Sequence, residues 1–174
     1  MTSDRAVALE DVRIGGSRIV IEPHNCFACG SLNVHGLHLE LHAGGDRCWT
    51  ELVLDRRFEG WEGIAHGGIL CTILDEVMAW SLVGADNWGV TARLAVDFKR
   101  PVPVDRIIRA EGWVTEMRRR LVTTAGSIVD VADGTLLASA DALYVAATQE
   151  RKRELQQRYG FRAGSDVPGT GARR

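Results

Sequence analysis

The stretch AHGGILCTILDEVMAWSLV, residues 65–83, determines how the rest of this 174-residue chain must fold. From Ile69 onward its apolar side chains recur at the i, i+3, i+4 and i+7 positions of a helix. Trp80 and Leu82 widen the apolar stripe almost all round, so the helix should be largely buried. Gly84 is the expected stop. The sequence therefore predicts one long core helix.

Segments with the character of β-strands flank this helix on both sides. Before it, Ile19–Glu22 and the alternating run Leu37–Leu41 predict strands, and Gly44-Gly45-Asp46 predicts a turn into a further strand, Trp49–Leu54. After it come four more runs, Val90–Lys99, Ile107–Glu116, Leu121–Val131 and Thr135–Ala147. A single apolar helix needs cover, and one curved antiparallel sheet wrapped around it gives an economical α+β fold.

The length is that of one domain. We expect a loose N-terminal arm over residues 1–17, the folded domain over residues 18–148, and a polar segment over residues 149–174. That last segment begins as a charged helix and continues from Gly160 as a disordered tail, because its composition is rich in glycine and basic residues.

Composition excludes some classes of function. With 45% hydrophobic and 25% charged residues and a net charge of −2, the chain is typical of a globular protein and has no broad basic surface for nucleic acid. Met1–Glu10 holds no apolar signal segment, and the apolar runs are shorter than the ~18 residues of a membrane span. We therefore expect a cytoplasmic protein with reduced cysteines and no membrane partner.

Two acids, Asp75 and Glu76, lie near the middle of the apolar helix, on a common side with Thr72 and Ala79. A buried carboxylate without a partner loses its hydration, so such a pair must be partnered or used. The alternative is a surface pair that meets solvent or an arginine such as Arg93 or Arg119.

His66-Gly67-Gly68 opens the helix, where the first backbone N–H groups have no acceptor within the helix. The two glycines would let a carbonyl oxygen approach those N–H groups, as in an oxyanion hole. The alternative is a simple turn capped by the histidine. Gly67 and Asp75 are about 12 Å apart along a straight helix, so one reacting group cannot contact both, and the second group should come from elsewhere, such as a neighbouring subunit.

The run from Ala65 to Glu76 resembles the signature of hotdog-fold thioesterases of the 4-hydroxybenzoyl-CoA and phenylacetic-acid-pathway type. In that family His-Gly-Gly opens the central helix, and an acid follows nine residues after the histidine. The run Val90–Pro101 is similar to the family's next strand, which commonly ends in a basic residue and a proline. The likeness covers roughly residues 36 to 148.

The resemblance implies a role for each matching residue. The N–H of Gly67 would polarise a thioester carbonyl and His66 would set the turn, while Asp75 would act as nucleophile or as general base for water. Thr91 would assist that water. In the family the site lies across a dimer interface, which answers the distance problem, so a homodimer or a dimer of dimers is expected.

Two departures leave questions open. Many relatives carry an amide side chain about six residues before the histidine, but this chain has Gly60 there. Glu76 directly follows Asp75, so either acid could do the work, although Asp75 matches the family position.

Basic and aromatic residues suggest where a substrate would bind. Arginine and lysine side chains suit the phosphates of coenzyme A, although a solvated hairpin tip is the alternative for the arginine run. Trp61, with Trp80 and Trp88, could line an acyl pocket or simply pack in the core. The candidate phosphate-binding residues are Lys99, Arg100, Arg118, Arg119 and Arg120.

Cys26-x-x-Cys29, with His24, His35 and His38 nearby, has the spacing of half a zinc site. No clear second pair accompanies it, and some relatives carry a similar stretch, which suggests packing or substrate gating. We therefore predict no metal and no cofactor.

The predicted reaction is hydrolysis of an acyl-coenzyme A, or a similar acyl-pantetheine thioester, to a carboxylic acid and a thiol. Two alternatives remain. A 3-hydroxyacyl-thioester dehydratase would use His66, which is the only histidine in the helix region. A non-catalytic acyl-CoA-binding protein of the same fold would explain the missing amide at Gly60.

Overall fold

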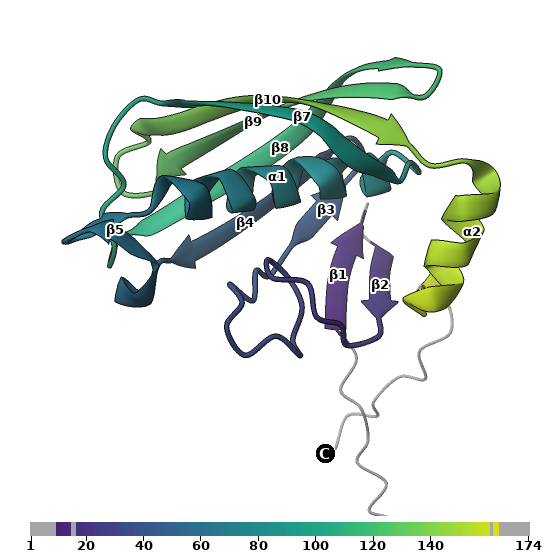
Figure 1. Cartoon of the computed structure of the whole chain (residues 1–174), viewed down its shortest axis with the longest axis horizontal. Helices are drawn as coiled ribbons and strands as arrows, with labels where there is room; N and C mark the ends of the chain where they lie inside the picture. The colour runs from purple at the N-terminus through teal and green to yellow at the C-terminus, as the bar shows by residue number, and fades with distance from the viewer. Residues whose placement is uncertain (1–9, 15–16, 161, 164–174) are drawn as a thin grey trace, which may run out of the picture.

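The computed structural model describes residues 10–14, 17–160 and 162–163, and it confirms the expected arrangement of one central helix against a curved antiparallel sheet (Figure 1). The helix, α1, spans Gly67–Gly84, two residues earlier at its start than the apolar pattern indicates. It lies along the concave face of the sheet. Gly84 ends it, as predicted.

Six strands form the antiparallel part of the sheet, in the order β3-β4-β8-β9-β10-β7. The chain enters this part at β3, and β7, which follows α1 in sequence, is the outermost strand at the far edge. All four strands predicted after the helix are confirmed. The bounds are β3 His42–Gly44, β4 Arg47–Val53, β7 Gly89–Phe98, β8 Ile107–Arg118, β9 Leu121–Asp130 and β10 Leu136–Ala146.

Shorter elements surround this frame. β1 pairs with β2 in an antiparallel hairpin and with β3 in parallel, and β11 pairs with β2. A small hairpin of β5 and β6 leads directly into α1. The bounds are β1 Glu10–Ile14, β2 Ser17–Ile21, the 3-10 turn η1 Arg56–Phe58, β5 Glu59–Trp61, β6 Ile64–Ala65, α2 Gln149–Arg158 and β11 Arg162–Ala163.

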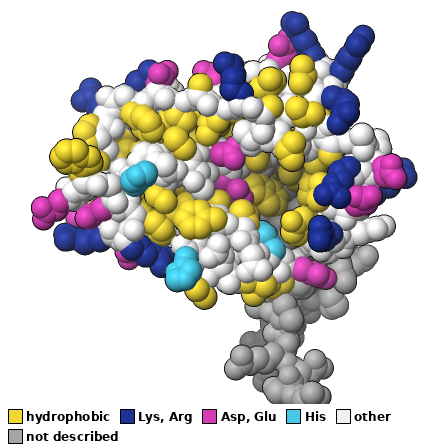
Figure 2. All heavy atoms as spheres, in the orientation of Figure 1, with side chains coloured by type: hydrophobic (Ala, Val, Ile, Leu, Met, Phe, Trp, Pro, Cys, Tyr) yellow, Lys and Arg dark blue, Asp and Glu magenta, His cyan; other side chains and the backbone are white. Residues whose placement is uncertain are grey.

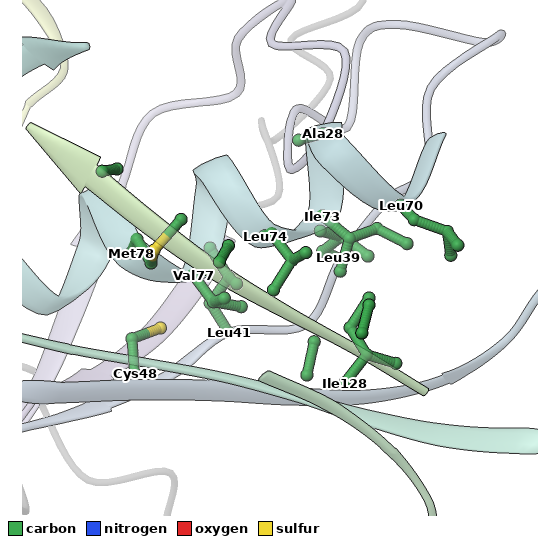
Figure 3. Close-up of a cluster of buried hydrophobic side chains, with 14 of the residues drawn as sticks. Ala28, Leu39, Leu41, Cys48, Leu70, Ile73, Leu74, Val77, Met78 and Ile128 are labelled. Atoms are coloured by element: carbon green, nitrogen blue, oxygen red, sulfur yellow. The ribbon is translucent and has the colours of Figure 1, made fainter. Parts of the chain in front are cut away.

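The core lies between α1 and the sheet, and its side chains interdigitate in Figure 3. Ile73, Leu74, Val77 and Met78 of the helix are fully buried against inward-facing residues of the strands. The helix comes close to the sheet at Gly112 of β8, where an added Cβ would lie 2.6 Å from the backbone nitrogen of Met78. The absence of a side chain there lets the helix rest directly on the sheet backbone.

The helix is largely buried, as predicted. Only Gly68 is exposed among its residues, and Thr72, Asp75 and Glu76 lie on a partly buried face. By length and composition alone α1 could cross a membrane, and it is the only such helix within the described ranges. Its buried face packs on the sheet, as in the core helix of a globular domain.

Three expectations need correction. Leu37–Leu41 is not a strand: Leu39 and Leu41 are buried, but the N–H of Leu39 donates to Ala28 in a loop and His38 has a positive φ of 51°, which breaks the extended run. Within the expected loose arm, Glu10–Ile14 forms β1, because it pairs with β2. Within the expected tail, Arg162–Ala163 forms β11 against β2. Residues 1–9, 15–16, 161 and 164–174 of these two segments lie outside the described residues.

Candidate active site

The carboxylate of Asp75 is held by two hydroxyl groups from the sheet. Thr91 Oγ1 donates to Asp75 Oδ1 at 2.8 Å, and the phenol of Tyr144 donates to the same oxygen at 2.8 Å. Oδ2 accepts no hydrogen bond within the described part of the chain. One oxygen is therefore anchored, and the other is available to a water molecule or a substrate.

Tyr144 is a residue of the site that sequence reasoning missed. It is fully buried in β10, opposite Thr91 in the β10–β7 register, and its hydroxyl also lies 3.0 Å from the carbonyl oxygen of Asp75. Burial, followed by the charge of Asp75, raises the pKa of Tyr144 well above its usual value, so the phenol stays protonated and donates. The feature of the sequence that could have indicated its role is a tyrosine within an apolar strand, because a buried phenol needs a hydrogen-bond partner.

Glu76 points away from this group. Trp80 Nε1 donates to Glu76 Oε1 at 2.9 Å, and Cys26 Sγ lies 3.9 Å from both carboxylate oxygens. Burial, followed by the negative charge of Cys26, raises the pKa of Glu76 to about 7. The two neighbouring acids therefore contact different groups. Neither is in an ion pair with Arg93 or Arg119 among the described contacts, which disfavours the surface-pair alternative.

The start of α1 has the geometry expected of an anion-binding helix end. His66 is the N-cap, and its Nδ1 accepts from the N–H of Gly68 at 2.9 Å. The N–H of Gly67 donates no hydrogen bond to any described group. An added Cβ on Gly67 would lie 3.3 Å from the ring of Phe98. Gly67 therefore lies beside the Phe98 ring at the end of β7 with its N–H unused, and His66 caps the helix.

A cavity of about 600 Å³ opens beside this N-terminus. Gly67, Phe98, Lys99 and Arg100 line it, together with Trp61, which is 82% exposed. Trp80 and Trp88 line a different cavity, so the three tryptophans do not form one pocket. Gly60 packs against His66, with its absent Cβ 3.0 Å from the histidine Cα, and a larger side chain would press on the turn.

The predicted phosphate-binding residues fall into two groups. Lys99 and Arg100 border the cavity at the start of α1, and Lys99 lies 3.3 Å from Asp97. The run Arg118–Arg120 forms the β8–β9 hairpin tip, where Arg119 has a φ of 53°. Arg120 also borders a hollow shared with the start of β7 and with α2. The two groups thus lie toward opposite ends of β7 within one chain.

Figure 2 shows how charge is distributed over the face that carries α1. Acidic side chains lie near the middle of this face among hydrophobic and uncharged ones, and most lysines and arginines lie toward its rim. Acidic groups surrounded by apolar surface, with basic groups outside them, suit a ligand with an apolar portion and an anionic portion.

Comparisons with known proteins show which proteins this chain is similar to. The model of the thioesterase superfamily matches residues 62–138, from just before β6 through α1 to the start of β10. The chain is similar to acyl-coenzyme A thioesterase THEM4 of Xenopus laevis, with 31% identity over 87 residues, which is 50% of this chain and 39% of the relative. The corresponding protein of Bos taurus is 27% identical over 93 residues, 53% of this chain and 38% of that one. The chain spans about two fifths of the length of these curated relatives.

Solved structures give the same result for the fold. A crystal structure of a thioesterase superfamily protein superimposes with a TM-score of 0.65 and 26% identity, over 70% of this chain and 60% of that one. Thioesterase superfamily member 2 of zebra fish gives 0.63 and 16%, over 68% and 90%. A hypothetical thioesterase protein of Streptococcus pneumoniae, crystallised with coenzyme A, gives 0.57 and 17%, over 60% and 83%.

These likenesses define the class of domain as a hotdog fold. The segment that the thioesterase-superfamily model matches contains all of α1, which agrees with the resemblance in the sequence.

Proposed function

We propose that this chain hydrolyses the thioester of an acyl-coenzyme A, or of a similar acyl-pantetheine, to a carboxylic acid and a thiol. The observation that carries the proposal is the pair of groups on α1: a carboxylate anchored through one oxygen at Asp75, and an unused backbone N–H at Gly67. A general base and an oxyanion donor are what acyl transfer to water requires.

The proposed chemistry uses Asp75 as a general base. Its free oxygen takes a proton from water while the water oxygen bonds to the thioester carbon, and the negative charge moves to the carbonyl oxygen. The N–H of Gly67 donates to that oxygen. When the carbonyl re-forms, the carbon–sulfur bond breaks, and the leaving sulfur takes the proton from Asp75. Thr91 and Tyr144 keep the carboxylate in position throughout.

We further propose that the site forms between two chains. β7 is an edge strand with ten residues, most of them exposed, including Val90 and Phe98. A long uncovered edge strand is suited to pairing with another strand. Antiparallel pairing of β7 with its copy around the middle of the strand would bring the start of one, with Thr91, to the end of the other, with Phe98. Asp75 of one chain would then approach Gly67 of the other.

The same pairing would unite the basic residues. Arg118–Arg120 lie near the start of β7 and Lys99 and Arg100 follow its end, so the partner's copy would bring the two groups to one site. Guanidinium groups bind phosphate oxygens in pairs. The Streptococcus pneumoniae structure with coenzyme A and a Streptococcus mutans structure bound to acetyl CoA support this class of ligand for the present fold.

The test is release of free thiol from a panel of acyl-coenzyme A thioesters. Asp75→Asn should lower kcat by about 10²- to 10⁴-fold, the usual contribution of a general base. Asp46→Asn, the same change at the exposed β3–β4 turn, is the matched control and should retain wild-type turnover.

Two outcomes would contradict the proposal. Full turnover by Asp75→Asn, together with loss of turnover in Glu76→Gln, would assign the chemistry to the other acid. A wild-type protein that binds coenzyme A but releases no thiol from any substrate would be a binding protein instead.

A further inference from the structure

A second cluster of chemically active side chains lies on the opposite side of Glu76 from Asp75. His24 Nε2, Cys26 Sγ and Cys29 Sγ all lie within 4.8 Å of one another. His24 Nε2 is 3.4 Å from Cys29 Sγ, and Cys26 Sγ is 3.9 Å from both oxygens of Glu76. One imidazole and two thiols of the loop therefore converge, and the Glu76 carboxylate on α1 lies beside the Cys26 thiol.

We propose that these four residues form a zinc site, which attaches the loop over residues 24–30 to the middle of α1. The proposal does not depend on the reaction assigned to Asp75. Zinc is bound tetrahedrally by cysteine sulfur at about 2.3 Å and by histidine nitrogen at about 2.0–2.1 Å. Those bond lengths require about 3.5–3.8 Å between ligand atoms in a tetrahedron. The observed separations of 3.4 Å and 3.9 Å lie within about 0.1 Å of that range, and the three loop ligand atoms all lie within 4.8 Å of one another.

The loop backbone is shaped to present the two sulfurs together. The N–H of Gly30 donates to the carbonyl of Cys26 at 3.0 Å, and the N–H of Leu32 donates to the carbonyl of His24 at 3.1 Å. A Cβ on Gly30 would overlap the carbonyl oxygen of His24 and lie 2.5 Å from the nitrogen of Cys26. Glycine after Cys-x-x-Cys is therefore required for the turn that places both thiols and the histidine on one side.

Neighbouring groups that are not themselves ligands contact the candidate ligands and orient them, as such neighbours do in known metal sites. His24 Nδ1 lies 3.3 Å from the carbonyl oxygen of Glu22, so a protonated Nδ1 would direct the lone pair of Nε2 toward Cys29 Sγ. Trp80 Nε1 holds Glu76 at 2.9 Å. Tyr159 packs its ring edge on His24, with ring centres 5.7 Å apart. A cavity of about 210 Å³ adjoins all four proposed ligands.

The test uses the purified full chain under reducing conditions, with Zn²⁺ and Co²⁺ as probes. We expect one Zn²⁺ per chain by elemental analysis. We also expect the sulfur-to-metal charge-transfer absorption and intense visible bands of a tetrahedral Co²⁺–thiolate site. Cys26→Ser and Cys29→Ser should each weaken binding by more than about 100-fold. Loss of a residue that only hydrogen-bonds to a ligand typically weakens metal binding by at most about 100-fold. Cys71→Ser, on α1 outside the cluster, is the matched control and should bind as the wild type does.

Two milder variants keep the proposal testable if loss of a cysteine unfolds the chain. Trp80→Phe should weaken Zn²⁺ binding by about 10- to 100-fold, and Glu76→Gln should change the Co²⁺ bands. Circular dichroism of the metal-free proteins shows whether each variant is folded. A reduced wild-type protein that binds neither ion more tightly than Cys26→Ser, or that contains only a Cys26–Cys29 disulfide after reductant treatment, would overturn the proposal.

Discussion

Thr91 and Asp75, sixteen residues apart in sequence, are joined by a 2.8 Å hydrogen bond from the threonine hydroxyl to Asp75 Oδ1. This bond links the edge strand β7 to the middle of α1. Tyr144 contacts the same oxygen from β10. The orientation of the carboxylate therefore depends on how two neighbouring strands meet the helix, and not on the helix alone.

Replacement of Thr91 tests whether that bond matters for turnover. Thr91→Val removes a hydrogen bond to a charged group, which is worth about 1.5–3 kcal/mol, so we expect kcat to fall by about 10- to 100-fold. KM should change little, because the hydroxyl contacts the carboxylate. Thr91→Ser keeps the hydroxyl and should retain most activity. A Val variant with wild-type kcat in steady-state thiol release would remove Thr91 from the site.

Tyr144 should act as a positioning residue for the same oxygen. Tyr144→Phe keeps the buried ring and removes the hydroxyl, so the free energy of unfolding should fall by only about 1–2 kcal/mol, while kcat falls by about tenfold. Because Thr91 and Tyr144 hold one oxygen atom, their effects should not add in the double variant. Urea unfolding and steady-state kinetics of the three variants measure both effects. Strict additivity in kcat would mean that the two hydroxyls act separately.

Much of the fold follows from local patterns, because the helix and the long strands each carry a clear period. The 3.6-residue period predicts α1 and the alternation predicts β7 to β10. The same alternation wrongly predicts a strand at Leu37–Leu41, because burial of every second side chain does not require strand pairing. The backbone of those residues forms hydrogen bonds to a loop instead. Alternation in the sequence indicates which side chains are buried, whereas the tertiary structure determines which groups the backbone hydrogen-bonds to.

The site was only partly predictable for the same reason. Asp75, Gly67, His66 and Thr91 lie in the motifs that carry the resemblance, and the structure joins Thr91 to Asp75. Tyr144 lies outside those motifs. The β10–β7 register shift between Leu143 and Tyr144 sets it opposite Thr91, and no local pattern in the sequence signals such a bulge.

His66 distinguishes hydrolysis from dehydration. Its Nδ1 accepts from the N–H of Gly68, so it serves as an N-cap. Asparagine is also a good N-cap, whereas alanine costs about 1 kcal/mol. We therefore expect His66→Asn to retain more stability and more thiol release than His66→Ala. Formation of an enoyl product from a 3-hydroxyacyl-CoA by the wild type, lost equally in both variants, would instead favour the dehydratase.

The shared site predicts complementation between two inactive variants. Asp75→Asn lacks the base, and Gly67→Val crowds the N–H beneath Phe98, where a Cβ would already lie 3.3 Å from the ring. If Asp75 of one chain works with Gly67 of the other, a mixed dimer has one intact site. A co-expressed 1:1 mixture should then recover about a quarter of wild-type kcat, since half of the dimers are mixed and each has one site of two. Each variant alone is the control. No recovery, in a mixture shown by mass spectrometry to contain mixed dimers, would place both groups in one chain.

The contact of α1 with the sheet can be tested through two glycines that share Met78 as a neighbour. An added Cβ at Gly112 would lie 2.6 Å from the backbone nitrogen of Met78, which can yield only if the whole helix shifts. At Gly126 the nearest atoms, at 3.1 Å, belong to the flexible Met78 side chain. Overpacking typically costs about 1–3 kcal/mol, so Gly112→Ala should lie at or above the top of that range and Gly126→Ala near the bottom. Urea unfolding measures both. Equal losses would mean that the helix does not rest on the β8 backbone as described, and the distance between Asp75 and its two hydroxyl donors would then have to be reconsidered.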